Sequence, residues 1–183
     1  MKSKKLKTFV EIGCCDFDTL IPLSKNGWQG HCIEPIKEYA DKLSHPNVTV
    51  SNCAISSYDG TMEMYVSVSE GEEWSRGISH AVNQKGSKLL EMPSNQHLLQ
   101  EKRTVDCYTL HTYLKKNKIT HIDFMKVDVE GHENDIFETY QWTVKPTFMK
   151  IEHRHIDDLY LRDILEKQGY MCYTEQSDMY AIR

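Results

Sequence analysis

The chain has 183 residues, a length that suits one domain with a single core. Its 22 basic and 27 acidic residues give a formal net charge of -5, so a broad cationic surface for nucleic acid is not expected. No stretch has the roughly 18 consecutive apolar residues of a membrane-spanning helix, and the N-terminus lacks the apolar segment of a secretory signal. We therefore expect a cytoplasmic protein with no transmembrane segment and no nucleic-acid partner.

Strand-length apolar runs alternate with amphipathic segments along the chain. This order predicts an α/β fold, a doubly wound and mostly parallel sheet with helices on both faces. A terminal pair of strands predicts a β-hairpin at the C-terminal end. In chain order the predicted strands are 8–12, 29–33, 48–51, 52–56, 61–68, 104–107, 122–127, 147–151, 170–174 and 179–182, and the predicted helices are 19–25, 36–43, 109–117, 133–140 and 159–168.

The middle of the chain interrupts this alternation. The dipeptide Asp59-Gly60 is a tight-turn signal, so we expect the runs 52–56 and 61–68 to pair as a hairpin. The polar stretch 69–88 that follows shows no period, and unstructured loops of this length in compact domains are often functional. We expect a lid or a substrate loop, in which Trp74 and Arg76 are suited to stack on and hydrogen-bond a sugar.

Six cysteines are scattered along the chain without Cys-x-x-Cys spacing. Several fall in predicted strands beside β-branched residues. This pattern favours reduced core cysteines over zinc ligands or a disulfide framework.

Polar residues gather where the predicted parallel strands end. In an open doubly wound sheet, ligands bind outside the carboxyl ends of the strands, so these residues are the candidates for a site. They are Glu11, Gly13, Asp16 and Asp18 after the first strand, Glu34 after the second, Asp128 and Glu130 after the strand 122–127, and Glu152, His153 and His155 after the strand 147–151.

The residue types at these ends favour one kind of cofactor. Glu34 lies 23 residues beyond Glu11 (34 minus 11), close to the spacing at which a carboxylate binds both ribose hydroxyls of a nucleotide. The loop 13–18 is poor in glycine and carries acids, which would repel a pyrophosphate. An S-adenosyl group has no phosphate and is cationic, so this loop suits it better than a dinucleotide.

Five ordered segments resemble the motifs of the FkbM family of S-adenosylmethionine-dependent methyltransferases. The likeness runs in register from about residue 8 to residue 153, and the segment after residue 121 is the most specific. The segments are 10–16 (VEIGCCD), 27–35 (GWQGHCIEP), 52–60 (NCAISSYDG), 122–133 (IDFMKVDVEGHE) and 150–152 (KIE).

The resemblance implies a class I methyltransferase (Rossmann-like) fold with strand order 3-2-1-4-5-7-6 and an antiparallel last strand. It also implies O-methylation of sugars or related small hydroxyl compounds, with S-adenosylmethionine converted to S-adenosylhomocysteine. By position, Glu11 and Gly13 would line the methionine end, Glu34 the ribose, and Cys53 and Ala54 the adenine edge. The full set of expected cofactor-binding residues is Glu11, Gly13, Cys14, Asp16, Glu34, Pro35, Cys53, Ala54 and Asp128.

Methyl transfer to a hydroxyl requires a positioned acceptor and removal of its proton. We expect the catalytic residues to be Asp128, Glu130 and His153, one of which acts as the general base. Alternatively, Asp128, Glu130 and Glu152 would hold a divalent cation that lowers the pKa of the acceptor. The expected substrate-binding residues are Trp74, Arg76, His132 and His155.

Two other function classes stay open at this point. A methyltransferase acting on nucleic acid or protein is one, although amino-group methylation of bases commonly uses an Asn-Pro-Pro-aromatic motif where this chain has Asp128-Val129-Glu130-Gly131. A non-catalytic module that binds S-adenosylmethionine is the other. We expect residues 1–183 to form a single methyltransferase domain, either a minimal enzyme or a domain of a longer protein.

Overall fold

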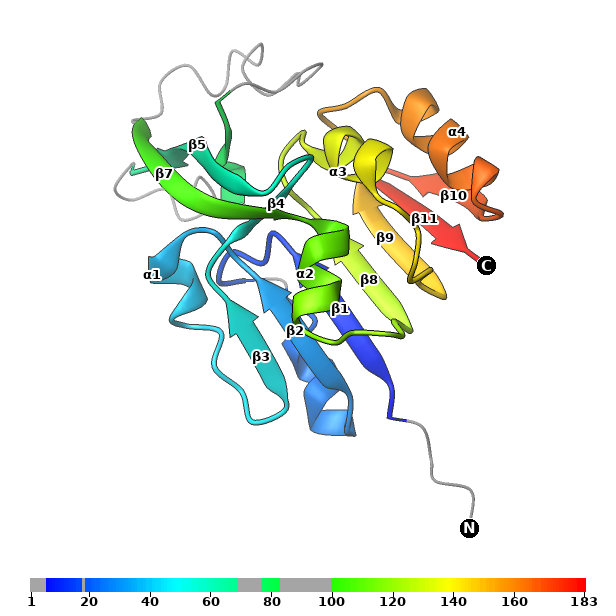
Figure 1. The fold of residues 1–183 in the computed structure, drawn as a ribbon, viewed down its shortest axis with the longest axis horizontal. Coiled ribbons are helices and arrows are strands. Elements are labelled where there is room, and N and C mark those ends of the chain that lie inside the picture. Colours follow the sequence, from blue (N-terminus) through cyan, green and yellow to red (C-terminus); the bar gives the residue numbers. More distant parts are fainter. Residues whose placement is uncertain (1–5, 18, 69–76, 83–99) are drawn as a thin grey trace.

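A seven-stranded sheet forms the centre of the computed structural model, which describes residues 6–17, 19–68, 77–82 and 100–183 (Figure 1). Its strand order is β10-β11-β9-β8-β1-β2-β3. All neighbouring pairs from β3 to β9 are parallel, and β11 runs antiparallel to both of its neighbours. This confirms the predicted order 3-2-1-4-5-7-6 and the C-terminal hairpin. The strands are β1 (Thr8–Ile12), β2 (Gln29–Ile33), β3 (Val48–Ser51), β8 (Phe124–Val127), β9 (Phe148–Glu152), β10 (Met171–Glu175) and β11 (Asp178–Ile182).

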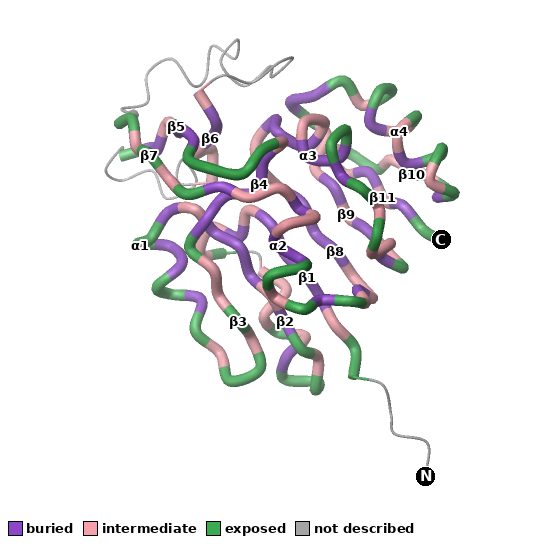
Figure 2. Tube along the Cα trace, viewed as in Figure 1, coloured by how far each residue is buried: buried purple, intermediate pink, exposed green. Residues whose placement is uncertain are grey.

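Helices pack against both faces of this sheet. On one face, apolar residues of α2 (Leu110–Lys116), α3 (Glu133–Thr139) and α4 (Asp158–Lys167) join alternate residues of the strands in the main hydrophobic core. On the other face, the 3-10 helix η1 (Ile21–Asn26) packs over β1 and β2. The sheet centre is therefore buried from both sides, as the purple segments of β1, β8 and β9 in Figure 2 show.

A second, four-stranded sheet lies across the carboxyl ends of β1 and β2 (Figure 1). Its order is β4-β7-β5-β6, and its strands are β4 (Ala54–Ser56), β5 (Gly60–Ser67), β6 (His80–Ala81) and β7 (Gln100–Thr109).

The predicted hairpin between 52–56 and 61–68 is wrong. Strand β7 lies between β4 and β5, and it pairs parallel with β4 and antiparallel with β5. The chain does bend at residues 57–59, and Asp59 ties this bend to the start of α2 by accepting hydrogen bonds from Thr109 N (2.7 Å) and Thr112 Oγ1 (2.8 Å). Alternation identifies a strand but not its partner, and β7 is ten residues long where the sequence predicted four.

The helices after β1 and β2 also differ from their predicted form. The segment predicted as a helix over 19–25 is the 3-10 helix η1, which ends at Gly27 with a φ of 81°. The segment predicted as 36–43 forms only the short helix α1 (Lys37–Ala40). Most other elements begin and end within about two residues of their predicted positions, the usual uncertainty of helix and strand ends.

Candidate functional site

A pocket opens at the carboxyl ends of β1, β2 and β8, beneath the second sheet. Open α/β sheets bind their ligands where the strand order reverses, and in this sheet the order reverses between the parallel neighbours β1 and β8. The predicted site residues that line it are Gly13, Cys14, Glu34, Pro35, Cys53, Ala54, Asp128, Glu130 and His132. Lining residues outside the predicted site set include Cys15, Tyr39, Met62, Met64, Ile78 and Lys126.

Gly13 lies in the loop that follows β1, at the point where this loop contacts the loop that follows β8. Its φ is +76°, and a Cβ at this position would lie 1.7 Å from the carbonyl oxygen of Asp128. Its amide donates a hydrogen bond to Ile33 O (2.9 Å), and the amide of Asp128 donates to Ile12 O (2.9 Å). Only glycine allows the two loops to approach this closely at the floor of the pocket.

Glu34 connects the loop 13–18 after β1, here called the cofactor loop, to the chain that follows β2. Its Oε2 accepts a hydrogen bond from Cys15 N (2.7 Å), and its Oε1 accepts one from Ile36 N (2.8 Å). Burial is the main reason why the pKa of this carboxyl rises to about 7, and the hydrogen bonds oppose the rise. Each carboxylate oxygen can accept a second hydrogen bond, so Glu34 can still receive two ribose hydroxyls.

Glu11 lies beneath the pocket and does not line it. Its side chain is fully buried, and Oε2 accepts a hydrogen bond from Leu20 N (2.8 Å). The ammonium of Lys126 lies 3.6 Å from Glu11 Oε1 and 3.9 Å from Asp128 Oδ2. Lys126 therefore connects the two acids, a role that the alternation pattern of its strand did not reveal.

Asp16 also lies away from the pocket in the described structure. Its carboxylate pairs with Lys42 (Nζ to Oδ2, 2.5 Å) and accepts a hydrogen bond from the thiol of Cys15 (3.6 Å). Asp16 therefore helps to fix the conformation of the loop after β1, and it is not among the residues that line the pocket.

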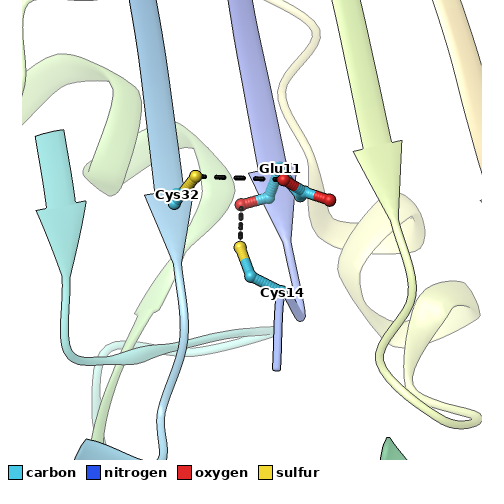
Figure 3. A group of neighbouring side chains, drawn as sticks. All are labelled: Glu11, Cys14 and Cys32. Atoms are coloured by element: carbon cyan, nitrogen blue, oxygen red, sulfur yellow. Dashed lines mark hydrogen bonds between the residues drawn. The ribbon is translucent and has the colours of Figure 1, made fainter. Parts of the chain in front are cut away.

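Two cysteines and one acid meet behind the cofactor loop (Figure 3). The ligand atoms of Glu11, Cys14 and Cys32 lie within 4.8 Å of one another. The thiol of Cys14 donates to Glu11 O (3.4 Å), and the thiol of Cys32 donates to Glu11 Oε2 (3.8 Å). Burial raises the pKa of the Cys14 thiol well above its usual value, which disfavours the thiolate that a metal would require. We interpret this group as hydrogen-bonded thiols of the core.

The acids after β8, Asp128 and Glu130, line another part of the pocket. Glu130 has a φ of +56°, and its Oε2 lies 3.2 Å from Nε2 of the buried His155. His132 lies beside it and shares a hydrogen bond with Ser56 (Nε2 to Oγ, 3.1 Å). Burial first, and then the charge of Glu130, raise the pKa of Asp128 to about 6. This part of the pocket therefore carries two carboxyls and a histidine within one loop.

The residues after β9 lie behind this loop, and none of Glu152, His153 and His155 lines the pocket in the described structure. His155 contacts the pocket-lining Glu130, and the amide of His153 donates a hydrogen bond to Ser177 O (2.8 Å). Burial raises the pKa of Glu152 to about 9, with a further contribution from neighbouring acids.

Trp74 and Arg76 lie outside the described residues, as does most of the predicted loop 69–88. The described part of that loop, residues 77–82, contributes Gly77, Ile78, Ser79 and Ala81 to the pocket. Gly77 packs against the ring of Phe17, since a Cβ there would lie 3.0 Å from Phe17 Cζ.

The raised carboxyl pKa values predict how stability changes with pH. Four acids, the buried Glu34 and Glu133 and the partly buried Asp128 and Glu152, have raised folded-state pKa values of about 7, 8, 6 and 9. Because they are raised above their unfolded values, the folded state binds more protons, and stability is lost as the pH rises through them. We expect the melting temperature of the ligand-free protein to fall from about pH 4, near the ordinary pKa values of these acids, to about pH 9. The variant Glu152→Gln should flatten the upper part of this decline, and a melting temperature that rises over the window would contradict the expectation.

The strand order, the reversed last strand and the acid-lined pocket define a Rossmann-like methyltransferase fold. A family model described as the Methyltransferase FkbM domain matches residues 11–172. The chain therefore belongs to the FkbM methyltransferase family, whose members are S-adenosylmethionine-dependent enzymes. No curated protein matches the chain. Among the described residues, no helix has the length and apolar character needed to cross a membrane.

Proposed function

We propose that this protein transfers a methyl group from S-adenosylmethionine to a hydroxyl of a sugar or a related small molecule. The observation that carries the proposal is one pocket that is lined both by Glu34 and by Asp128 and Glu130. Glu34 suits a ribose, and Asp128 and Glu130 suit a cationic methyl donor beside an acceptor that must lose a proton.

The residues present fit the cofactor. Gly13 lets the loops after β1 and β8 meet at the floor of the pocket, Glu34 has acceptor capacity for two hydroxyls, and the lining side chains of Met62 and Met64 offer an apolar surface for a flat base. The acids of the site are compatible with a cation and unfavourable for a phosphate. When bound, S-adenosylmethionine supplies an electrophilic methyl group on a sulfonium.

Glu130 is the best-placed general base of the three candidates. It lines the pocket, and His155 holds its carboxylate from behind at 3.2 Å. Asp128 also lines the pocket, but its Oδ2 lies 3.9 Å from the Lys126 ammonium, whose charge opposes part of the rise in the pKa of Asp128 that burial causes. We therefore assign proton removal from the acceptor to Glu130 and charge balance at the methyl donor to Asp128.

A screen with radiolabelled cofactor tests this function. Nucleotide sugars, free glycans and lipid-linked sugars would be offered, and label on a hydroxyl is the expected result. With the acceptor found, Glu130→Gln should lower kcat by about 100-fold or more, the usual contribution of a general base. Glu63→Gln, an exposed acid of β5, is the matched control and should leave kcat unchanged. Label on nucleic acid or protein, or no transfer despite cofactor binding, would favour one of the other two classes.

A divalent cation held by Asp128, Glu130 and Glu152 is the alternative to a side-chain base. Burial is the main cause that raises the pKa of Glu152 to about 9, and neighbouring acids add to it; a cation would relieve this second contribution, which favours the metal. Full transfer in excess chelator is the outcome expected for a Glu130 base. Loss of transfer in chelator, reversed by Mg²⁺ or Mn²⁺, would instead support the metal.

The proposal includes a cytoplasmic location. All six cysteines are free thiols in the structure, which suits a reducing compartment. Imaging of the tagged full-length protein tests this part of the proposal.

A further inference from the structure

Glu133 begins helix α3 and is completely buried. Its Oε1 accepts a hydrogen bond from Val129 N (2.9 Å), and its Oε2 accepts one from Gly131 N (3.1 Å). These two amides belong to the residues on either side of Glu130. One buried carboxylate thus holds the backbone before and after the proposed general base.

The conformation of Glu130 explains why such a device is needed. Its φ of +56° is left-handed, a region that residues with a Cβ occupy at an energetic cost and that other interactions must maintain. The next residue, Gly131, also has a positive φ, of 102°. In this conformation the Glu130 carboxylate meets Nε2 of His155 at 3.2 Å.

We infer that Glu133 is a positioning residue, which fixes Glu130 in its left-handed conformation and so directs the carboxylate of Glu130 toward His155 and the pocket. Glu133 does not line the pocket in the described structure, and its hydrogen bonds reach Glu130 through the backbone of the loop. The inference deepens the proposed function and rests on it for the catalytic meaning of Glu130.

The chemistry of the two hydrogen bonds provides a sharp variant. Both partners are N–H donors, so both side-chain oxygens must accept. Glu133→Gln keeps the shape of the side chain but turns one acceptor into an NH₂ donor, which leaves an amide of the loop without a partner. Glu138→Gln, an exposed position on the same helix, is the matched control.

Amide hydrogen exchange and NMR of the His155 ring test the inference. In Glu133→Gln we expect exchange of the Val129 or Gly131 amide to accelerate by about tenfold or more, while the amides later in α3 keep their rates. We also expect the ring signals of His155 to change in the direction seen in Glu130→Gln, because both variants remove the same contact. Uniform acceleration across α3, or unchanged His155 signals, would overturn the positioning role.

Two further measurements keep the test decisive. If Glu133→Gln does not fold, amide exchange in the unsubstituted protein still tests the inference. The amides of Val129 and Gly131 should exchange as slowly as those of the strands. Rates typical of an open loop would overturn the inference. In addition, Glu133→Gln should lower the melting temperature less in a Glu130→Gly background, where the left-handed conformation has no cost. None of these measurements needs a cofactor or an acceptor. A failure of the proposed function would instead appear as absent cofactor binding or absent methyl transfer, so the two failures can be distinguished.

Discussion

Replacement of Gly13 by alanine should destabilise the protein by about 3 kcal/mol or more, the sum of a left-handed conformation and an overpacked contact. The added Cβ would lie 1.7 Å from the carbonyl oxygen of Asp128, so the loops after β1 and β8 must separate. For a chain of this size the melting temperature should fall by about 6 °C or more. Binding of S-adenosylhomocysteine, measured by calorimetry, should be lost because the floor of the pocket moves.

Gly27→Ala is the control for this prediction. Gly27 also has a positive φ, of +81°, but a Cβ there meets nothing within 4 Å. It should therefore show the cost of the left-handed conformation alone, about 1 kcal/mol, and leave cofactor binding intact. Equal destabilisation by the two substitutions would show that the contact between Gly13 and Asp128 has no energetic importance.

Replacement of Glu34 by alanine should weaken binding of S-adenosylhomocysteine by about 100-fold. The variant removes an acceptor for two hydroxyl groups, and each hydrogen bond to a charged group contributes about 1.5 kcal/mol or more. It also releases the amides of Cys15 and Ile36, which hold the loops on both sides of the ribose position. Titration calorimetry near pH 8, above the pKa of about 7, measures the effect with the carboxylate ionised.

The pH dependence of binding separates the two roles of Glu34. Because ribose hydroxyls donate to the charged carboxylate, affinity in the unsubstituted protein should rise as the pH passes through about 7, and this rise should vanish in Glu34→Ala. Glu38→Ala, an exposed acid of α1 that pairs with Arg103, should bind like the unsubstituted protein. Unchanged affinity in Glu34→Ala would remove the ribose assignment.

The sheet was predictable because its signals are local or are carried by motifs. Apolar strands such as β1 and β2 stand out by composition, and the resemblance supplied their order, which the structure confirms. The partner of a strand is not local information. Strand β5 has clear alternation and a clear turn before it, yet it pairs with β7, which begins more than thirty residues after β5 ends.

Part of the candidate site could likewise be predicted from the sequence, and part could not. Residues such as Gly13, Glu34 and Asp128 lie at strand ends, where the topology rule directs attention, and all three line the pocket. Lys126 and Glu133 were not predicted as site residues because their importance lies in buried contacts. Lys126 lies between the acids Glu11 and Asp128, and Glu133 accepts hydrogen bonds from backbone amides. A single sequence shows a charged residue within a strand or at a helix start, but not which groups it meets.

The construction of the pocket from two sheets implies that its two halves can change separately. Gly13 and Glu34 belong to the parallel sheet, whereas Met62, Met64 and Ala81 lie on β5 and β6 of the second sheet, which is built from one stretch of chain between β3 and α2. A chimaera that exchanged this stretch between two members of the family would keep Gly13 and Glu34 and replace the apolar wall that Met62, Met64 and Ala81 form. The apolar wall and the strand-end residues of the pocket are therefore separate units of the chain, and each can vary while the other is kept.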